Sequence, residues 1–305
     1  MSGPRIIDTH MHPYTKTEWR CMEKFFKPLF SYLYHKQFTD QDLIDFFPTE
    51  EQMVEAYRQA NMVAFPTAWD AETNTGDPPT TNDYVAGLIK KYPDVFITGW
   101  AMIDPWKGVK MMAEIERAIK ELKLIGFKFQ QTAQGFHVHD KQFYPMWDLI
   151  NSLGVPVQLH GVYTGLGTGR PGAMGIKLSH NMIFPDMDYV SADFPRIKFI
   201  ILHVSEPWTA EAGALARHKA NVFRECSGML PKYFPEEMLF DMNRRLQDKY
   251  MFGTDYPLFQ LPVLLEQHKG NNYREGVWEK IMWKNTVRIL GEDMERVGID
   301  LKEWL

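Results

Sequence analysis

The stretch Ile6-Ile7-Asp8-Thr9-His10-Met11-His12 joins a short apolar run to two histidines at alternate positions. Side chains at positions i and i+2 of a β-strand point to the same face, so His10 and His12 can bind one ion. A His-x-His pair alone is weak evidence, because histidines are also common on loops and in cores. The stretch therefore predicts a first strand, and a metal site only if further ligands follow downstream.

Short apolar runs recur along the chain and alternate with amphipathic stretches that are typical of helices, such as residues 49–60, 109–122 and 143–153. Alternating strands and helices predict a parallel sheet, and eight such units predict an α/β fold closed into a (β/α)8 TIM barrel. An open doubly wound sheet is the alternative. The expected strands are residues 5–9, 62–65, 95–102, 125–129, 155–159, 198–202, 221–225 and 250–253.

Two segments are longer than ordinary connections and predict insertions after strands 1 and 5. Residues 14–47 are rich in aromatic and basic side chains, and they either pack on the barrel rim or form a lid over its mouth. Residues 161–179 contain six glycines, but their spacing does not match the dinucleotide motif G-x-G-x-x-G. This second segment either folds over a bound anion, with Arg170 and Lys177, or is a mobile surface loop.

Composition and charge narrow the class of protein. The 305 residues are 45% hydrophobic and 24% charged, and no linker divides them, so we expect one barrel domain over residues 1–305. The net charge of −5 is spread without a long run of one sign, which argues against a nucleic-acid partner. With no membrane-length apolar stretch, no targeting segment and two distant cysteines, the chain is expected to be cytoplasmic and to bind no membrane.

Three further apolar runs end in a side chain that can bind a metal ion or transfer a proton. The fifth, sixth and eighth expected strands are followed by His160, His203 and Asp255. Such groups are costly inside a barrel unless they are paired or metal-bound. Because the carboxyl ends of barrel strands meet at one rim, we expect these residues to converge on His10 and His12.

The order His-x-His, His, His and Asp on these strands resembles the amidohydrolase superfamily. The motif Gly253-Thr254-Asp255-Tyr256-Pro257, the leading Asp8, the loop 169–172 and the tail 283–290 resemble the branch that includes aminocarboxymuconate-semialdehyde decarboxylase. The resemblance spans nearly the whole chain. It implies that one divalent ion, zinc or alternatively manganese, is bound by His10, His12, His160 and Asp255.

The resemblance also implies that His203 stands beside the ion and that His203 and Asp255 are the catalytic residues. A divalent ion lowers the pKa of a bound water from about 15.7 towards about 7. With an ordinary pKa of about 6.5, His203 could then carry protons. In the decarboxylases of the family this apparatus helps to protonate a carbon as carbon dioxide leaves, and in its hydrolases metal-bound hydroxide attacks a carbonyl.

We therefore expect a metal-dependent carboxy-lyase that decarboxylates an aromatic or unsaturated carboxylic acid. The alternatives are a metal-dependent hydrolase of a lactone, ester or amide, and a barrel that binds a ligand without turnover. The partner is expected to be a small-molecule carboxylate, held by Lys128 and Arg170. Lys128 could instead be a carboxylated lysine that bridges two metals, or a structural residue in an ion pair. Family members are commonly homo-oligomers, and residues 19–38 could form the interface.

The other histidines are expected to be structural. His137 and His139 form a second His-x-His pair, but they lie in a loop rather than on an apolar strand, so we predict a surface position or one outside the metal ligands. Glu206, just after His203, could orient the His203 ring or cap the next helix. The remaining histidines lie in polar or helical contexts and are expected to be structural: His35, His180, His218 and His268.

Overall fold

The computed structural model describes residues 4–305 and contains eight parallel strands in the expected order. Residues 1–3, on which the expected absence of a targeting segment partly rests, lie outside this description. The strands are β1 (Ile6–Met11), β2 (Met62–Pro66), β3 (Trp100–Ala101), β4 (Gly126–Phe129), β5 (Val157–His160), β6 (Phe199–Leu202), β7 (Val222–Glu225) and β8 (Tyr250–Met251).

The third strand is much shorter than predicted. Only Trp100–Ala101 pairs with β4, whereas residues 95–102 were expected to be extended. The N–H groups of Val95 and Phe96 both donate to the carbonyl of Tyr92, at 3.0 and 2.9 Å, at the end of the preceding helix. A backbone N–H used in this turn is not available to a neighbouring strand, so the apolar run begins as a turn.

Hydrogen bonds close the ring of strands, as predicted for a TIM barrel. Strands β3 to β8 form one continuous sheet, and β1 pairs with β2. Between β1 and β8, the Thr9 N–H donates to the Phe252 carbonyl at 3.0 Å and the His12 N–H to the Tyr256 carbonyl at 2.9 Å. Between β2 and β3, the Ala68 N–H donates to the Trp100 carbonyl at 3.0 Å.

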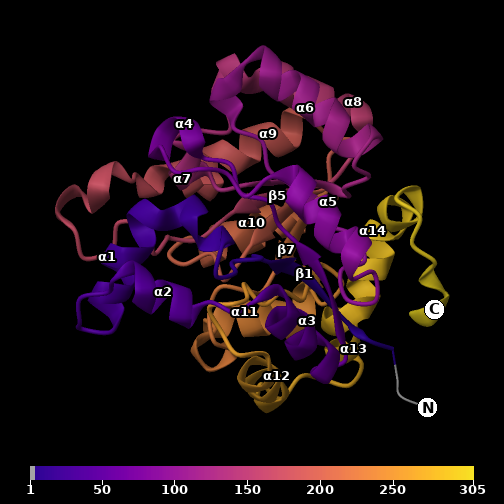
Figure 1. Ribbon diagram of the computed structural model, residues 1–305. Helices are drawn as coiled ribbons and strands as arrows, with labels where there is room; N and C mark the ends of the chain where they lie inside the picture. Colours follow the sequence, from indigo (N-terminus) through magenta and orange to yellow (C-terminus); the bar gives the residue numbers. More distant parts are fainter. Residues whose placement is uncertain (1–3) are drawn as a thin grey trace.

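Helices surround the barrel (Figure 1). Among the three predicted helices, α3 (Glu50–Gln59) begins with a capping box between Thr49 and Gln52, α6 spans Val109–Lys120, and α8 (Tyr144–Leu153) ends at Gly154 with φ +65°. No helix among residues 4–305 is long and apolar enough to cross a membrane. The other α-helices are α1 (Glu23–Leu33), α2 (Asp40–Phe46), α4 (Glu72–Thr75), α5 (Asn82–Lys91), α7 (Gln131–Gln134), α9 (Asp188–Asp193), α10 (Thr209–His218), α11 (Glu236–Phe240), α12 (Leu261–Gly270), α13 (Val277–Glu279) and α14 (Asn285–Arg296).

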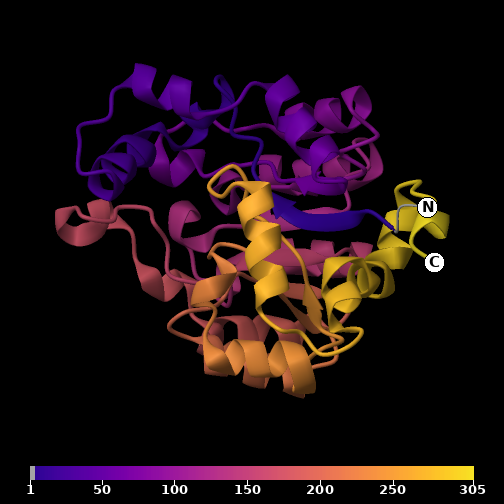
Figure 2. The same ribbon diagram turned by 90° about the horizontal axis from the view of Figure 1, so that it is seen from below.

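The two insertions lie at the end of the molecule away from the chain termini (Figure 2). They touch each other: a Cβ built on Gly169, whose φ is +74°, would lie 2.3 Å from the ring of Tyr32 on α1, so only glycine allows this approach. A Cβ built on Gly165 would lie 3.2 Å from the end of the Leu29 side chain, so the loop also packs closely on α1 there. Helix α1 and the loop after β5 therefore form one wall at the carboxyl end of the barrel.

Asp8 joins β1 to the segment that follows β8. Its Oδ1 accepts the backbone N–H groups of His10 and Thr254, both at 3.0 Å. Its Oδ2 accepts the hydroxyl groups of Tyr57 at 2.6 Å and Thr254 at 2.5 Å. Burial raises the pKa of Asp8 to about 7, and these hydrogen bonds act against that rise. One carboxyl group thus sets the register of His10 beside Asp255.

We expect Asp8→Ala to lower the free energy of unfolding by about 3 kcal/mol, because four buried donors lose their acceptor. Tyr57→Phe removes one of these bonds and should cost about 1 kcal/mol. Urea unfolding followed by circular dichroism measures both values. Equal losses in the two variants would contradict the assigned role of Asp8.

Candidate metal centre

The ends of β1 and β8 bring His10, His12 and Asp255 into one buried group. The Nε2 atoms of His10 and His12 lie 3.5 and 3.6 Å from Oδ1 of Asp255. One potential ligand atom from each residue lies within 4.8 Å of the other two. The two imidazoles meet edge to face, with ring centroids 4.9 Å apart. The strand alternation seen in the sequence therefore does place both histidines against the same carboxylate.

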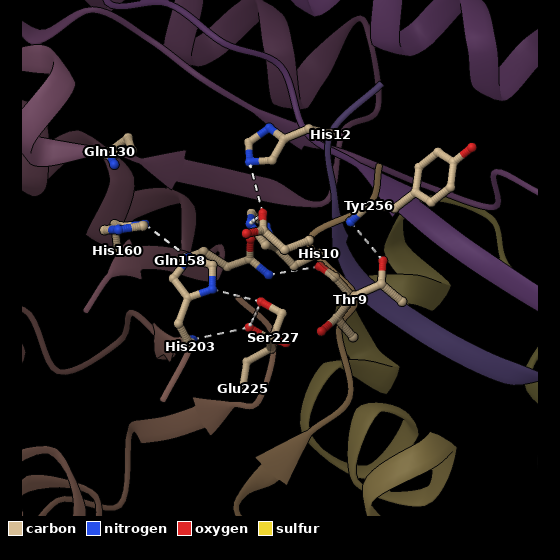
Figure 3. Close-up of polar contacts among 12 residues, drawn as sticks. Thr9, His10, His12, Gln130, Gln158, His160, His203, Glu225, Ser227 and Tyr256 are labelled. Carbon is tan, nitrogen blue, oxygen red and sulfur yellow. Dashed lines mark hydrogen bonds and ion pairs between the residues drawn. The ribbon is translucent and has the colours of Figure 1, made fainter. Parts of the chain in front are cut away.

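His160 and His203 lie on the other side of this group (Figure 3). Their rings contact each other through His203 Nε2 and His160 Nδ1, which are 3.0 Å apart, and the His203 ring centroid lies 5.3 Å from that of His10. His160 is not part of the tight three-residue group with Asp255. The structure thus brings all five predicted residues to one rim, while the role of His160 as a ligand stays a prediction.

Unpaired nitrogen atoms indicate that this cluster fits a metal ion. Within residues 4–305, His10 Nδ1 and Nε2, His12 Nδ1 and His160 Nε2 are buried without a hydrogen-bond partner. Buried polar atoms without partners are unfavourable, and neutral imidazole nitrogens are zinc and manganese ligands. Burial lowers the pKa of all three histidines and so favours the neutral, ligating form.

Asp255 supplies the negative charge of the cluster. Burial alone would raise the pKa of its carboxyl group, but His10, His203 and His12 lower it well below the ordinary value. The carboxylate is therefore ionised beside neutral imidazoles, which is the donor set that a divalent ion requires.

His203 is positioned from behind by two residues that the sequence analysis did not select. The Ser227 hydroxyl donates to Glu225 Oε2 at 2.7 Å and lies 2.8 Å from His203 Nδ1. Because that hydroxyl is already donating, His203 Nδ1 carries the hydrogen and Nε2 has a free lone pair. His160 Nδ1 then donates to His203 Nε2, which leaves His160 Nε2 unprotonated and able to bind an ion.

The expected pKa of His203 needs correction. Burial lowers the pKa of His203 to about 3, against the value of about 6.5 assumed from the sequence. Glu206, the sequence candidate for orienting this ring, is exposed, and Glu225 at the end of β7 takes that position through Ser227. Burial raises the pKa of Glu225 to about 8. In the sequence, the Glu-x-Ser pair directly at the end of the seventh expected strand could have indicated these two residues.

A cavity of about 420 Å³ opens beside the cluster and contains His12, His160, His203 and Asp255 in its wall. Much of its outer wall is apolar and comes from the two insertions, so residues 14–47 line the cavity. The apolar and aromatic side chains that line it include Tyr14, Met22, Phe26, Leu29, Phe30, Leu33, Trp69, Val162 and Leu166.

Lys128 is the cation in this cavity. It is only 1% exposed, its Nζ lies 5.4 Å from the ring centroid of Trp69, and within residues 4–305 it forms no ion pair. The described residues therefore offer no ion pair that would make Lys128 a structural lysine, and its role stays a prediction. Burial lowers the pKa of Lys128 to about 8, while Asp255 acts in the opposite direction.

Arg170, the other predicted substrate-binding residue, is exposed on the loop after β5 and is not part of the cavity wall. Its role stays a prediction. Among residues 4–305, one group of metal-ligating side chains lines the cavity, which favours a single ion and argues against Lys128 as a bridge between two metals.

The chain matches the sequence model of the amidohydrolase family over residues 7–291. No curated protein matches it. Among solved structures, it resembles a TIM-barrel protein from Bordetella bronchiseptica, with 20% identity, coverage of 95% of this chain and 99% of that chain, and a TM-score of 0.74.

Two similar structures are decarboxylases. The 5-carboxyvanillate decarboxylase of Sphingomonas paucimobilis is 17% identical, with coverage of 95% and 99% and a TM-score of 0.70. A dihydroxybenzoic acid decarboxylase of Polaromonas sp. JS666, solved with manganese and the inhibitor 2-nitroresorcinol, is 18% identical, with coverage of 98% and 100% and a TM-score of 0.68.

A further similar structure is described as a hydrolase. This Pseudomonas putida protein, provisionally described as a 2-pyrone-4,6-dicarboxylic acid hydrolase, is 15% identical, with coverage of 98% and 100% and a TM-score of 0.62.

We expect Asp255→Ala and His160→Ala to lose bound metal and His203→Asn to keep it, because His203 faces a neighbouring ring rather than the ion. Each variant is loaded with zinc, dialysed and analysed by inductively coupled plasma mass spectrometry. Thermal unfolding confirms that each variant is folded. Metal loss from a folded His203→Asn protein would show that His203 was misassigned.

Proposed function

We propose that this chain, which belongs to the amidohydrolase family, is a metal-dependent carboxy-lyase that removes carbon dioxide from an aromatic or unsaturated carboxylic acid. One observation carries the proposal. A buried cation without an ion-pair partner within residues 4–305, an apolar wall rich in aromatic rings and the His/Asp cluster all face the same cavity. An aromatic carboxylate could pair with the cation, pack its ring on the apolar wall and reach the His/Asp cluster in the same cavity.

Lys128 would bind the anionic group of the substrate. With a pKa of about 8, it keeps its charge at neutral pH although it is buried. Isolating a charge from water is unfavourable unless an opposite charge is nearby. A substrate carboxylate or phenolate would provide that charge and would gain a charge-assisted hydrogen bond.

The aromatic wall would hold the ring. Trp69 and Tyr14 lie next to His12, with ring centroids 5.7 and 4.7 Å from it, and Phe26 continues the wall from α1. Aromatic rings pack favourably edge to face or offset at such separations. A planar substrate that packs on this wall could direct its carboxylate towards Lys128 and its ring towards His203, since both line the cavity.

His203 would handle the proton. His203 lines the cavity, Ser227 and Glu225 hold its Nδ1 side, and its Nε2 lies 3.0 Å from His160 Nδ1. If the His160 contact were released, Nε2 could take a proton from a substrate hydroxyl group or water and pass it to the ring carbon. As that carbon is protonated, the electrons of the C–CO₂ bond return to the ring and carbon dioxide leaves. A zinc or manganese ion held by His10, His12 and Asp255 would act as a Lewis acid towards the substrate oxygens.

Hydrolysis of a lactone, ester or amide is the second candidate function. The similarity to the Pseudomonas putida protein supports it. The neutral His203 could equally take a proton from a water molecule that attacks a carbonyl carbon. The lyase ranks first because two similar structures are decarboxylases and because Lys128 suits a carboxylate.

We expect zinc- or manganese-loaded protein to release carbon dioxide from at least one compound of a hydroxybenzoate panel. A panel of lactones is tested in parallel, and carbon dioxide is measured by a coupled assay. Ring opening of a lactone with no carbon dioxide release from any acid would reject the lyase and support the hydrolase.

We expect Lys128→Met to lower kcat/KM for an accepted acid by about 10- to 100-fold, because a buried charge-assisted bond contributes about 1.5–3 kcal/mol. Lys302→Met is the control, since the Lys302 side chain is 89% exposed near the carboxyl end of the chain and is not part of the cavity wall. Steady-state kinetics at neutral pH measure both. Equal kinetics for the Lys128 variant and the parent would exclude Lys128 from substrate binding.

A further inference from the structure

A second group of metal-ligating side chains lies outside the cavity described above. His137 and His139 follow α7, and Asp186 lies in the short helical turn Ile183–Met187 of the insertion after β5. His137 Nδ1 is 2.8 Å from Asp186 Oδ2, and His139 Nδ1 is 3.1 Å from Asp186 Oδ1. One potential ligand atom from each residue lies within 4.8 Å of the other two. From the sequence, both histidines were expected at the surface or outside the metal ligands.

Some imidazole nitrogen atoms in and beside this group are buried and have no hydrogen-bond partner among the described residues. His180 is 8% exposed and its ring meets that of His137 edge to face, with centroids 4.6 Å apart. In the described part of the chain, the buried Nδ1 atoms of His180 and His139 both lack a hydrogen-bond partner. Asp186 is near His139 Nδ1 but not in hydrogen-bonding geometry. Such unpaired atoms in a cluster of imidazoles need a further partner.

We propose that His137, His139 and Asp186 bind a second divalent transition-metal ion, with zinc best suited to two imidazoles and one carboxylate. Zinc–ligand bonds of about 2.1 Å place tetrahedral ligand atoms about 3.4 Å apart, so the separations of 2.8 and 3.1 Å between the imidazoles and the Asp186 carboxylate would have to widen by about 0.3 to 0.6 Å. The fourth position is open towards His180 or a water molecule.

The surroundings of the site favour binding of an ion from solution. The side chains of His137 and His139 are 37% and 36% exposed, whereas that of Asp186 is 2% exposed. Trp147 Nε1 donates to the carbonyl of Val138 at 2.8 Å, which holds the backbone between the two histidines. The carboxylate is therefore buried, while the partly exposed imidazoles leave an entry path.

An ion at this site would join two loops that lie at the mouth of the cavity. His137 and His139 belong to the connection after β4, and Asp186 belongs to the insertion after β5. In that insertion, Asn181 Nδ2 donates to the carbonyl of Val162 at 2.9 Å, and Val162 lines the cavity. The second ion would thus hold the wall over the cavity in place without touching the substrate.

The test is a count of zinc ions per chain. The full chain is stripped with a chelator, reloaded with zinc, freed of excess metal by gel filtration and analysed by inductively coupled plasma mass spectrometry. We expect Asp186→Asn and His139→Ala each to hold one zinc ion fewer than the parent, and this difference should persist in an Asp255→Ala background. His218→Ala, which removes an exposed histidine of α10, should match the parent.

Equal zinc content in the parent and in both folded variants would overturn the proposal and leave a hydrogen-bonded cluster only. His139→Ala keeps the test decisive if Asp186→Asn does not fold, because His139 is partly exposed. Hydrogen–deuterium exchange gives the second readout: zinc should slow exchange of residues 161–187 several-fold in the parent but not in His139→Ala. Loss of one ion with unchanged exchange would overturn the loop-holding role.

Discussion

The arrangement of the candidate centre depends on the contact between the first and last strands of the barrel. Asp8 accepts the N–H groups of both His10 and Thr254, so the residue before Asp255 is tied to the strand that carries the histidine pair. The N–H group of Asp255 itself donates to the His10 carbonyl at 2.9 Å. A change of register at this contact would move the carboxylate to a different face, because side chains alternate along strands. The contact that closes the ring of strands therefore also brings the residues of the cluster together.

A chain of hydrogen bonds then sets the protonation of the histidines. It runs from Glu225 through Ser227 and His203 to His160, and each donor determines which nitrogen of the next ring keeps a lone pair. Burial keeps these imidazoles neutral, and Asp255 stays ionised among them. The rim of the barrel thus presents lone pairs and one negative charge, while Lys128 presents a positive charge to the same cavity. This separation of charge suits a substrate that brings its own anionic group.

The two insertions provide the apolar part of the cavity wall. The strand ends provide polar side chains, whereas α1 and the loop after β5 add the apolar wall against which a ring can pack. Gly169 allows that loop to contact Tyr32 of α1 directly. In the proposed second metal site, Asp186 belongs to the same insertion, so one segment would link the chemistry of the cavity to a metal-dependent support outside it.

Much of this protein was determined by its sequence alone. The eight apolar runs, the helix start at Thr49 and the polar residues at the strand ends predicted the closed barrel and the five residues that meet at its rim, because alternation and strand direction act locally and repeat along the chain. Only the tertiary structure decided which residues form hydrogen bonds or ion pairs with these site residues and with the second group of histidines. Glu225 and Ser227 reach His203, Asp8 reaches Thr254, and Asp186 reaches His137 only because the fold brings distant segments together. The lowered pKa values of His203 and Lys128 likewise arise from burial, which is a property of the packed molecule and not of any local pattern.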